Sequence, residues 1–199
     1  MINYDIAKKT LEAGKTDYID FFKDNGNILE YGYCLLLRGD LKKAKEILQT
    51  IESTRADWAV KLIQFMKGYV EVLPTYFQIR NFLEIDINLL LLANQSDAIS
   101  YILGGADILY SVNCESYKYI ARVMMNNGYF DIAKTYLDKA RERTFNDPEL
   151  HFMYCQYHIR NQEFDKALKS IEECLNILPE YYPAVKIKEV LSGKGCTNL

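Results

Sequence analysis

The sequence is short of the residues and motifs on which catalysis usually depends. Only two of its 199 residues are histidines, and none of its five cysteines form a Cys-x-x-Cys pair. A zinc ribbon and a thioredoxin-type centre are therefore excluded by spacing. A Gly-x-Gly-x-x-Gly fingerprint, a P-loop and a Gly-x-Ser-x-Gly elbow are also missing. We accordingly predict no enzyme: no catalytic residues, no metal and no cofactor.

The two histidines leave one alternative open. His151 and His158 lie roughly 10 Å apart along a helix, too far to share one zinc ion. Cys155 lies within about one turn of each, so a contact between thiol and imidazole is geometrically possible. A catalytic dyad also needs an orienting group and an oxyanion site, and the sequence shows neither. Packing between helices is therefore the favoured role of these three side chains.

Runs of one charge sign and long apolar runs are also missing. The formal net charge is −3, with a pI near 5.5 and no Lys/Arg block. The longest apolar run, Leu89–Ala93, is far shorter than the roughly 20 residues that span a bilayer. Residues 1–10 contain no apolar core of a signal peptide. We therefore expect no nucleic acid, no membrane insertion and a cytoplasmic location, and the unpaired cysteine number fits a reducing compartment.

What the sequence does contain is an internal repeat. Residues 114–147 align with residues 148–181 at an offset of 34. Each unit is typical of two helices joined by a short turn, at Asn127-Gly128 and at Asn161-Gln162. Most matched positions are apolar or aromatic in both units, and a histidine of the second unit stands opposite Tyr117 and Met124 of the first. The pairs are Tyr117 with His151, Ile120 with Tyr154, Ala121 with Cys155, Met124 with His158, Phe130 with Phe164, Ala133 with Ala167, Leu137 with Ile171, and Ala140 with Cys174.

This pattern resembles the tetratricopeptide repeat family. Its aromatic, alanine, apolar and proline positions are occupied here by Phe164, Ala167, Ile171 and Pro179. Residues 25–56 fit the same spacing through Tyr31, Gly32, Leu35, Gly39, Leu41, Ala44, Leu48 and Ile51. The last unit departs from the family where His151 replaces the usual tryptophan and Cys155 the usual glycine.

The resemblance implies an all-α fold, an α-solenoid of antiparallel helix pairs wound into a right-handed superhelix. We predict one domain over residues 1–199, with regular repeats at about 25–56, 114–147 and 148–181, and a capping helix at 182–191. Residues 57–113 do not keep the repeat spacing, so we expect an irregular middle with helices at Asp57–Gly68, Pro74–Leu83, Ile85–Asn94 and Asp97–Tyr110. Further helices are expected at Ile6–Ala13 and Asp17–Asp24, and a frayed tail at Ser192–Leu199.

The resemblance also implies a peptide-binding groove formed by the first helices of the pairs. Lys118, Arg122 and Asn126 recur every four residues and share one helix face, where the two cations could hold a carboxylate. Alternatively, Lys118 and Arg122 pair with Glu115 and Glu149. The full set of predicted groove residues is Tyr33, Glu115, Lys118, Arg122, Met125, Asn126, Phe152, Gln156, Ile159 and Arg160.

We therefore predict a non-catalytic adaptor, scaffold or chaperone-like factor that binds a protein or peptide. One alternative is a homodimeric scaffold that assembles through the apolar stretch Leu35–Leu37 or through an imperfect end cap. Another is an accessory module of a bacterial glycosyltransferase system that positions an acceptor protein, because Tyr76–Glu84 is similar to repeat regions appended to family-2 glycosyltransferases. The abundance of Lys, Ile, Asn and Tyr favours a bacterial source.

Overall fold

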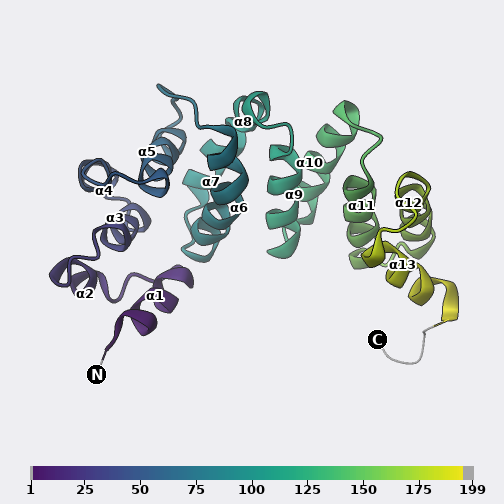
Figure 1. Ribbon diagram of the computed structural model, residues 1–199, viewed down its shortest axis with the longest axis horizontal. Coiled ribbons are helices and arrows are strands. Elements are labelled where there is room, and N and C mark those ends of the chain that lie inside the picture. Colours follow the sequence, from purple (N-terminus) through teal and green to yellow (C-terminus); the bar gives the residue numbers. More distant parts are fainter. Residues whose placement is uncertain (1, 195–199) are drawn as a thin grey trace. The chain divides into compact units, whose positions relative to one another are not determined.

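A computed structural model describes residues 2–194, and all regular structure within them is helical (Figure 1). Thirteen α-helices and one short π-helical turn follow one another, with no strand in this part of the chain. The prediction of an all-α fold is confirmed. The chain divides into two compact units, Met1–Ser116 and Tyr117–Leu199, which are described separately below. The boundary falls close to the predicted start of the regular repeats at Cys114.

Unit 1 contains eight helices among its described residues, and helices that are neighbours in the sequence generally pack together. The expected helices at 6–13 and 17–24 are present, and their ends agree with the prediction to within two residues. The eight are α1 (Tyr4–Glu12), α2 (Ile19–Asp24), α3 (Ile28–Leu37), α4 (Leu41–Leu48), α5 (Thr54–Met66), α6 (Tyr76–Leu92), α7 (Ser96–Gly104) and α8 (Ala106–Val112).

The pair α3 and α4 shows why the predicted repeat at 25–56 folds as it does. Asp40 caps α4, because its carboxylate accepts the backbone N–H of Lys43. Gly32 allows the two helices to approach closely, since a Cβ at this position would lie 2.7 Å from a methyl carbon of Leu48. The glycine therefore serves packing inside a helix, where its intrinsic propensity is poor.

The irregular middle differs from the prediction in three ways. The expected helices at 74–83 and 85–94 are one continuous helix, α6, which starts at a capping box between Thr75 and Gln78. Helix α5 begins three residues earlier than expected, because Ser53 is its N-cap, and the Asp57 carboxylate binds Lys61 within the helix. The expected helix at 97–110 is broken at Gly105 into α7 and α8. Apolar periodicity alone did not locate these breaks, because caps and a glycine decide them.

Unit 2 has the predicted repeat. Its helices are α9 (Ser116–Asn126, which begins at the last residue of unit 1), α10 (Phe130–Arg143), α11 (Pro148–Arg160), α12 (Phe164–Ile177) and α13 (Tyr182–Glu189), followed by the π-helical turn η1 (Val190–Lys194). Both ends of α12 lie 34 residues after those of α10. The two predicted turns contain matching residues with positive φ, Gly128 at 83° and Gln162 at 60°.

The C-terminal end of unit 2 is covered by its last helix. Helix α13 packs on α12, and Ala184 joins a buried cluster with Cys155, Ala167, Ile171 and Cys174. A helix is therefore present where the capping helix was predicted. Residues 195–199 of the predicted frayed tail, with Cys196, lie outside the described residues. Within the described chain, no helix is both long enough and apolar enough to cross a membrane.

Candidate functional site

The two predicted cations on α9, Lys118 and Arg122, form ion pairs within unit 2. We call these two residues the basic stripe. The side chain of Lys118 is only 6% exposed, and its Nζ lies 2.5 Å from Asp147 Oδ2 and 2.9 Å from Glu149 Oε2. Arg122 Nη2 donates to Glu149 Oε1 at 2.6 Å. The alternative pairing of both cations with Glu149 is therefore seen, and Asp147 is a further partner of Lys118 that the sequence analysis missed.

Asp147 explains why Lys118 points inward. This residue is the N-cap of α11, where its Oδ1 accepts the backbone N–H groups of Glu149 and Leu150. Its Oδ2 accepts from Lys118, so one carboxylate fixes the start of α11 and also ties it to α9. The ammonium group of Lys118 thus stabilises a helix junction and is enclosed by two carboxylates.

The other predicted groove residues do not share one environment. Met125 is buried, Asn126 and Arg160 are exposed, and Gln156 is half-buried. Two further predicted residues, Phe152 and Ile159, pack against the buried cluster of unit 2, and the Phe152 ring meets Tyr181 edge to face at 5.4 Å. Glu115 and Tyr33 belong to unit 1.

The histidines have structural partners. His151 Nε2 lies 2.7 Å from the carbonyl oxygen of Phe145, and its Nδ1 lies 3.1 Å from Glu173 Oε2. His158 Nδ1 lies 2.6 Å from Glu163 Oε2. Burial raises the pKa of the Cys155 thiol to about 12, so it stays protonated at neutral pH and is a poor nucleophile. Among the described residues, no group of three His, Cys, Asp or Glu side chains could hold a metal ion.

A cavity of about 520 Å³ lies in unit 1 between α1, α3, α5 and α6. Its walls are mostly apolar, and Ile85 of α6 remains 56% exposed there. Charged side chains from α1 and α3 stand at its edge. The lining residues are Lys8, Leu11, Glu12, Leu29, Glu30, Tyr33, Arg55, Phe82, Ile85, Asn88 and Leu89. We call this cavity the α6 pocket.

A buried ionic cluster fixes one side of the α6 pocket. The Arg55 guanidinium lies between two aromatic rings, 4.8 Å from the centroid of Tyr33 and 4.6 Å from that of Phe82. Arg55 also forms an ion pair with Asp86, which is 1% exposed. The Asp86 carboxylate further accepts hydrogen bonds from the Tyr33 hydroxyl at 3.1 Å and from Trp58 Nε1 at 2.5 Å.

The electrostatics of this cluster follow from its burial. Desolvation raises the pKa of Asp86, and the positive charge of Arg55 and the three hydrogen bonds oppose that rise. Burial also raises the pKa of Tyr33 well above its usual value, with the Asp86 charge adding to the effect. The Tyr33 phenol is therefore a neutral donor at physiological pH. Arg55 Nη1 is buried and has no hydrogen-bond partner.

Tyr33 is the one member of this cluster that was predicted as a site residue from the sequence. Arg55 and Trp58 are spaced to share a face of α5, and Phe82 and Asp86 to share a face of α6. Phe82 and Asp86 share a face only if the helix continues through Glu84, where a break was predicted. The sole tryptophan of the chain, fully buried, was the available signal.

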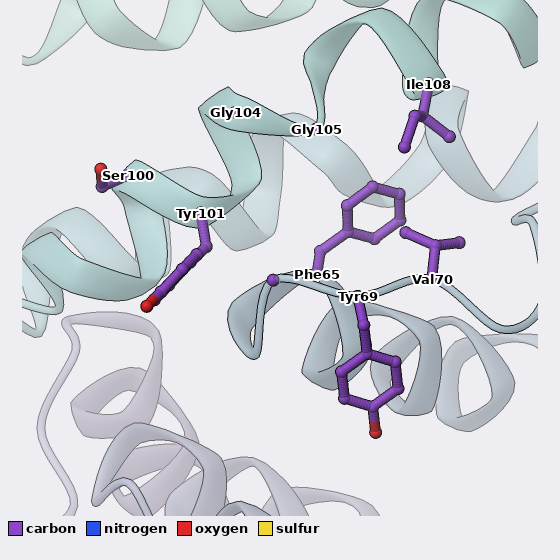
Figure 2. A pocket seen from close by; sticks show the side chains of 9 residues that line it. Phe65, Tyr69, Val70, Ser100, Tyr101, Gly104, Gly105 and Ile108 are labelled. Carbon is purple, nitrogen blue, oxygen red and sulfur yellow. The ribbon is translucent and has the colours of Figure 1, made fainter.

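A second, smaller cavity of about 300 Å³ lies where the end of α5 meets α7 and α8 (Figure 2). Figure 2 shows the Phe65 ring near the ribbon at Gly105, with Tyr101 projecting from α7. A Cβ on Gly105 would lie 2.8 Å from the Phe65 ring, so the glycine makes room for that ring. No charged side chain lines this cavity.

No protein-family model, no curated protein and no solved structure matches the chain. Over residues 2–194 the structure is all-helical, helices that are neighbours in the sequence pack together, and unit 1 holds a cavity of about 520 Å³ that is lined in part by Arg55 of the buried ionic cluster.

Proposed function

We propose that this chain is a non-catalytic, tetratricopeptide-like α-solenoid that binds a segment of a partner protein in the cytoplasm. The α6 pocket is the binding site in this proposal. The observation that carries it is a pocket of about 520 Å³ that combines apolar walls with an aromatic-stacked guanidinium. The 34-residue correspondence of α10 with α12 supports the repeat architecture.

An exposed apolar row beside the pocket favours a polypeptide ligand. Phe77, Ile85 and Leu92 of α6 are 65%, 56% and 45% exposed. Their spacing of eight and seven residues places them on one helix face. The row extends over about 22 Å along α6, which exceeds a single side chain and suits an elongated segment. Contiguous exposed apolar patches mark interaction sites, so the proposal requires that these three side chains act as one surface.

The two alternative functions fare differently. Leu35, Leu36 and Leu37 are buried within unit 1, so self-association through them has no exposed surface on which to act. The segment Tyr76–Glu84 forms the first half of α6 and includes the exposed Phe77. Binding of an acceptor protein on this helix is therefore compatible with the proposed site, and we regard it as one form of the same function.

A display selection with a random dodecamer library tests the proposal. The full chain is immobilised, enriched peptides are synthesised, and their affinity is measured by fluorescence polarisation. We expect Ile85→Asp to abolish binding, because the charge would lie against the apolar wall. Tyr129→Asp is the matched control, since Tyr129 is also exposed but lies in unit 2. Failure to enrich any peptide, or equal affinity for the Ile85→Asp variant, would refute the proposal.

A further inference from the structure

The rim of the α6 pocket carries more negative than positive charge. Glu12 and Lys8 come from α1, and Glu30 comes from α3. The Tyr4 hydroxyl donates a hydrogen bond to Glu30 Oε1 at 2.6 Å, and Lys8 Nζ lies 5.5 Å from the centroid of the Tyr4 ring. The pKa of Lys8 is raised by its interaction with Tyr4 and, to a smaller extent, by Glu30 and Glu12. One ammonium group therefore stands among two carboxylates.

The charge of the whole unit has the same sign. Residues 1–116 contain 12 Lys and Arg against 16 Asp and Glu, a balance of −4, whereas residues 117–199 contain 12 against 11, a balance of +1. A cationic ligand is therefore favoured at the pocket by the local rim and by the longer-range field of its own unit.

The inner wall sets a different requirement. The Arg55 charge is already compensated by Asp86, whose carboxylate is buried and accepts three hydrogen bonds. A ligand carboxylate brought next to Arg55 would lose its hydration and would also be repelled by Asp86. Uncharged apolar groups incur neither penalty, and the surrounding Leu29, Phe82 and Leu89 offer them contact.

We infer that the α6 pocket recognises a bulky apolar side chain that has a lysine or arginine beside it in the partner segment. The apolar side chain fills the pocket, and the neighbouring cation meets Glu12 and Glu30 at the rim. This inference rests on the proposed function and specifies the chemistry of the partner. It is distinct from the basic stripe on α9, which would have selected an acidic segment.

The test uses a second dodecamer library with a central Leu, Phe or Trp and randomised flanking positions. We expect Lys and Arg to be enriched next to the fixed apolar residue. For the best enriched peptide, Glu12→Gln should weaken binding by about two- to fivefold, which is the usual contribution of one exposed ion pair. Glu30→Gln should act in the same direction, and added NaCl should reduce the affinity.

A matched control separates the rim from the overall charge. Glu52→Gln removes one exposed carboxylate of unit 1 that does not line the pocket, and it should leave the affinity unchanged. Peptides that lose binding with Ile85→Asp but carry neutral or acidic flanks would overturn this inference and leave the proposed function intact. An equal effect of Glu12→Gln and Glu52→Gln would likewise overturn it. Enriched peptides that bind Ile85→Asp normally would refute the proposed function itself.

Discussion

Replacing Arg55 by methionine is the most informative perturbation of the buried cluster. Methionine keeps much of the length and the apolar contact of the side chain but removes the guanidinium from between the Tyr33 and Phe82 rings. The Asp86 carboxylate, 1% exposed, would then keep only its hydrogen bonds from Tyr33 and Trp58. An anion without its counter-charge would remain in the helix interface.

The magnitude follows from these contacts. Breaking a buried ion pair by removing one partner costs about 3–5 kcal/mol. The side chain of Arg55 is 22% exposed, so partial solvation places the ionic loss near the lower end of that range. Two cation–π contacts add about 0.5–1 kcal/mol each. We therefore expect Arg55→Met to lower the free energy of unfolding of unit 1 by about 4 kcal/mol at neutral pH.

The loss should depend on pH with a definite sign. The pKa of Asp86 is raised in the folded chain above its ordinary value of 3.8. At a pH between the ordinary pKa and the raised pKa of the folded chain, the folded state binds more protons than the unfolded state. The contribution of Asp86 to stability therefore increases as the pH falls through this range. Without Arg55 the pKa rises further. The deficit of Arg55→Met relative to the wild type should therefore shrink as the pH is lowered from neutral.

Urea titration followed by tryptophan fluorescence measures this effect directly. Trp58 is the only tryptophan and donates to Asp86, so its emission reports the cluster. The matched variant is Arg55→Met combined with Asp86→Asn, which removes the uncompensated charge and should recover at least half of the loss. A cost below about 1 kcal/mol for Arg55→Met, or no recovery in the double variant, would refute the electrostatic account.

Three further predictions concern packing and the thiols. Gly105→Ala should destabilise unit 1 by about 1–3 kcal/mol in urea titrations, because the new Cβ would lie 2.8 Å from the Phe65 ring. The control is Gly104→Ala, whose Cβ would meet nothing within 4 Å and which should be neutral or stabilising. Equal effects of the two substitutions would contradict this prediction. Gly32→Ala should lower the melting temperature seen by circular dichroism, because the new Cβ would collide with Leu48. In a Cys196→Ser background, a thiol reagent at pH 8 should label the exposed Cys114 rapidly. The other three thiols are buried and should react only after unfolding, namely Cys34, Cys155 and Cys174. Rapid labelling of a second thiol in the native chain would count against this arrangement.

The helices were predictable where sequence and packing agree. In unit 2, small and apolar residues recur at a fixed offset because each helix pair buries the same face, so periodicity located α10 and α12 and the turns at Gly128 and Gln162. In residues 57–113 the helix limits depend on single caps. Thr75 and Gln78 start α6, and no glycine or proline interrupts it, so the helix continues through Glu84, where a break was predicted.

The site was less predictable than the fold, for a physical reason. Repeat positions indicate which face of a helix looks inward, but they do not say whether a charged side chain there is free. Lys118 was expected to meet a ligand, and the N-cap Asp147 holds it instead. Asp86 was not among the predicted site residues, and burial together with its three hydrogen-bond donors makes it the centre of a cluster. Both outcomes depend on partners about 30 residues away in the sequence, which local spacing does not reveal.

The residues of the α6 pocket that stabilise unit 1 differ from those proposed to contact the ligand, and this separation decides how its function can be tested. Arg55 and Asp86 are needed for the stability of unit 1, so a loss of binding in variants of these residues would not distinguish a damaged fold from a damaged site. Glu12 and Ile85 are exposed, and substitutions at such positions usually change stability by no more than about 0.5 kcal/mol. A change in affinity at Glu12 or Ile85 that leaves the urea midpoint unchanged can therefore be assigned to ligand contact.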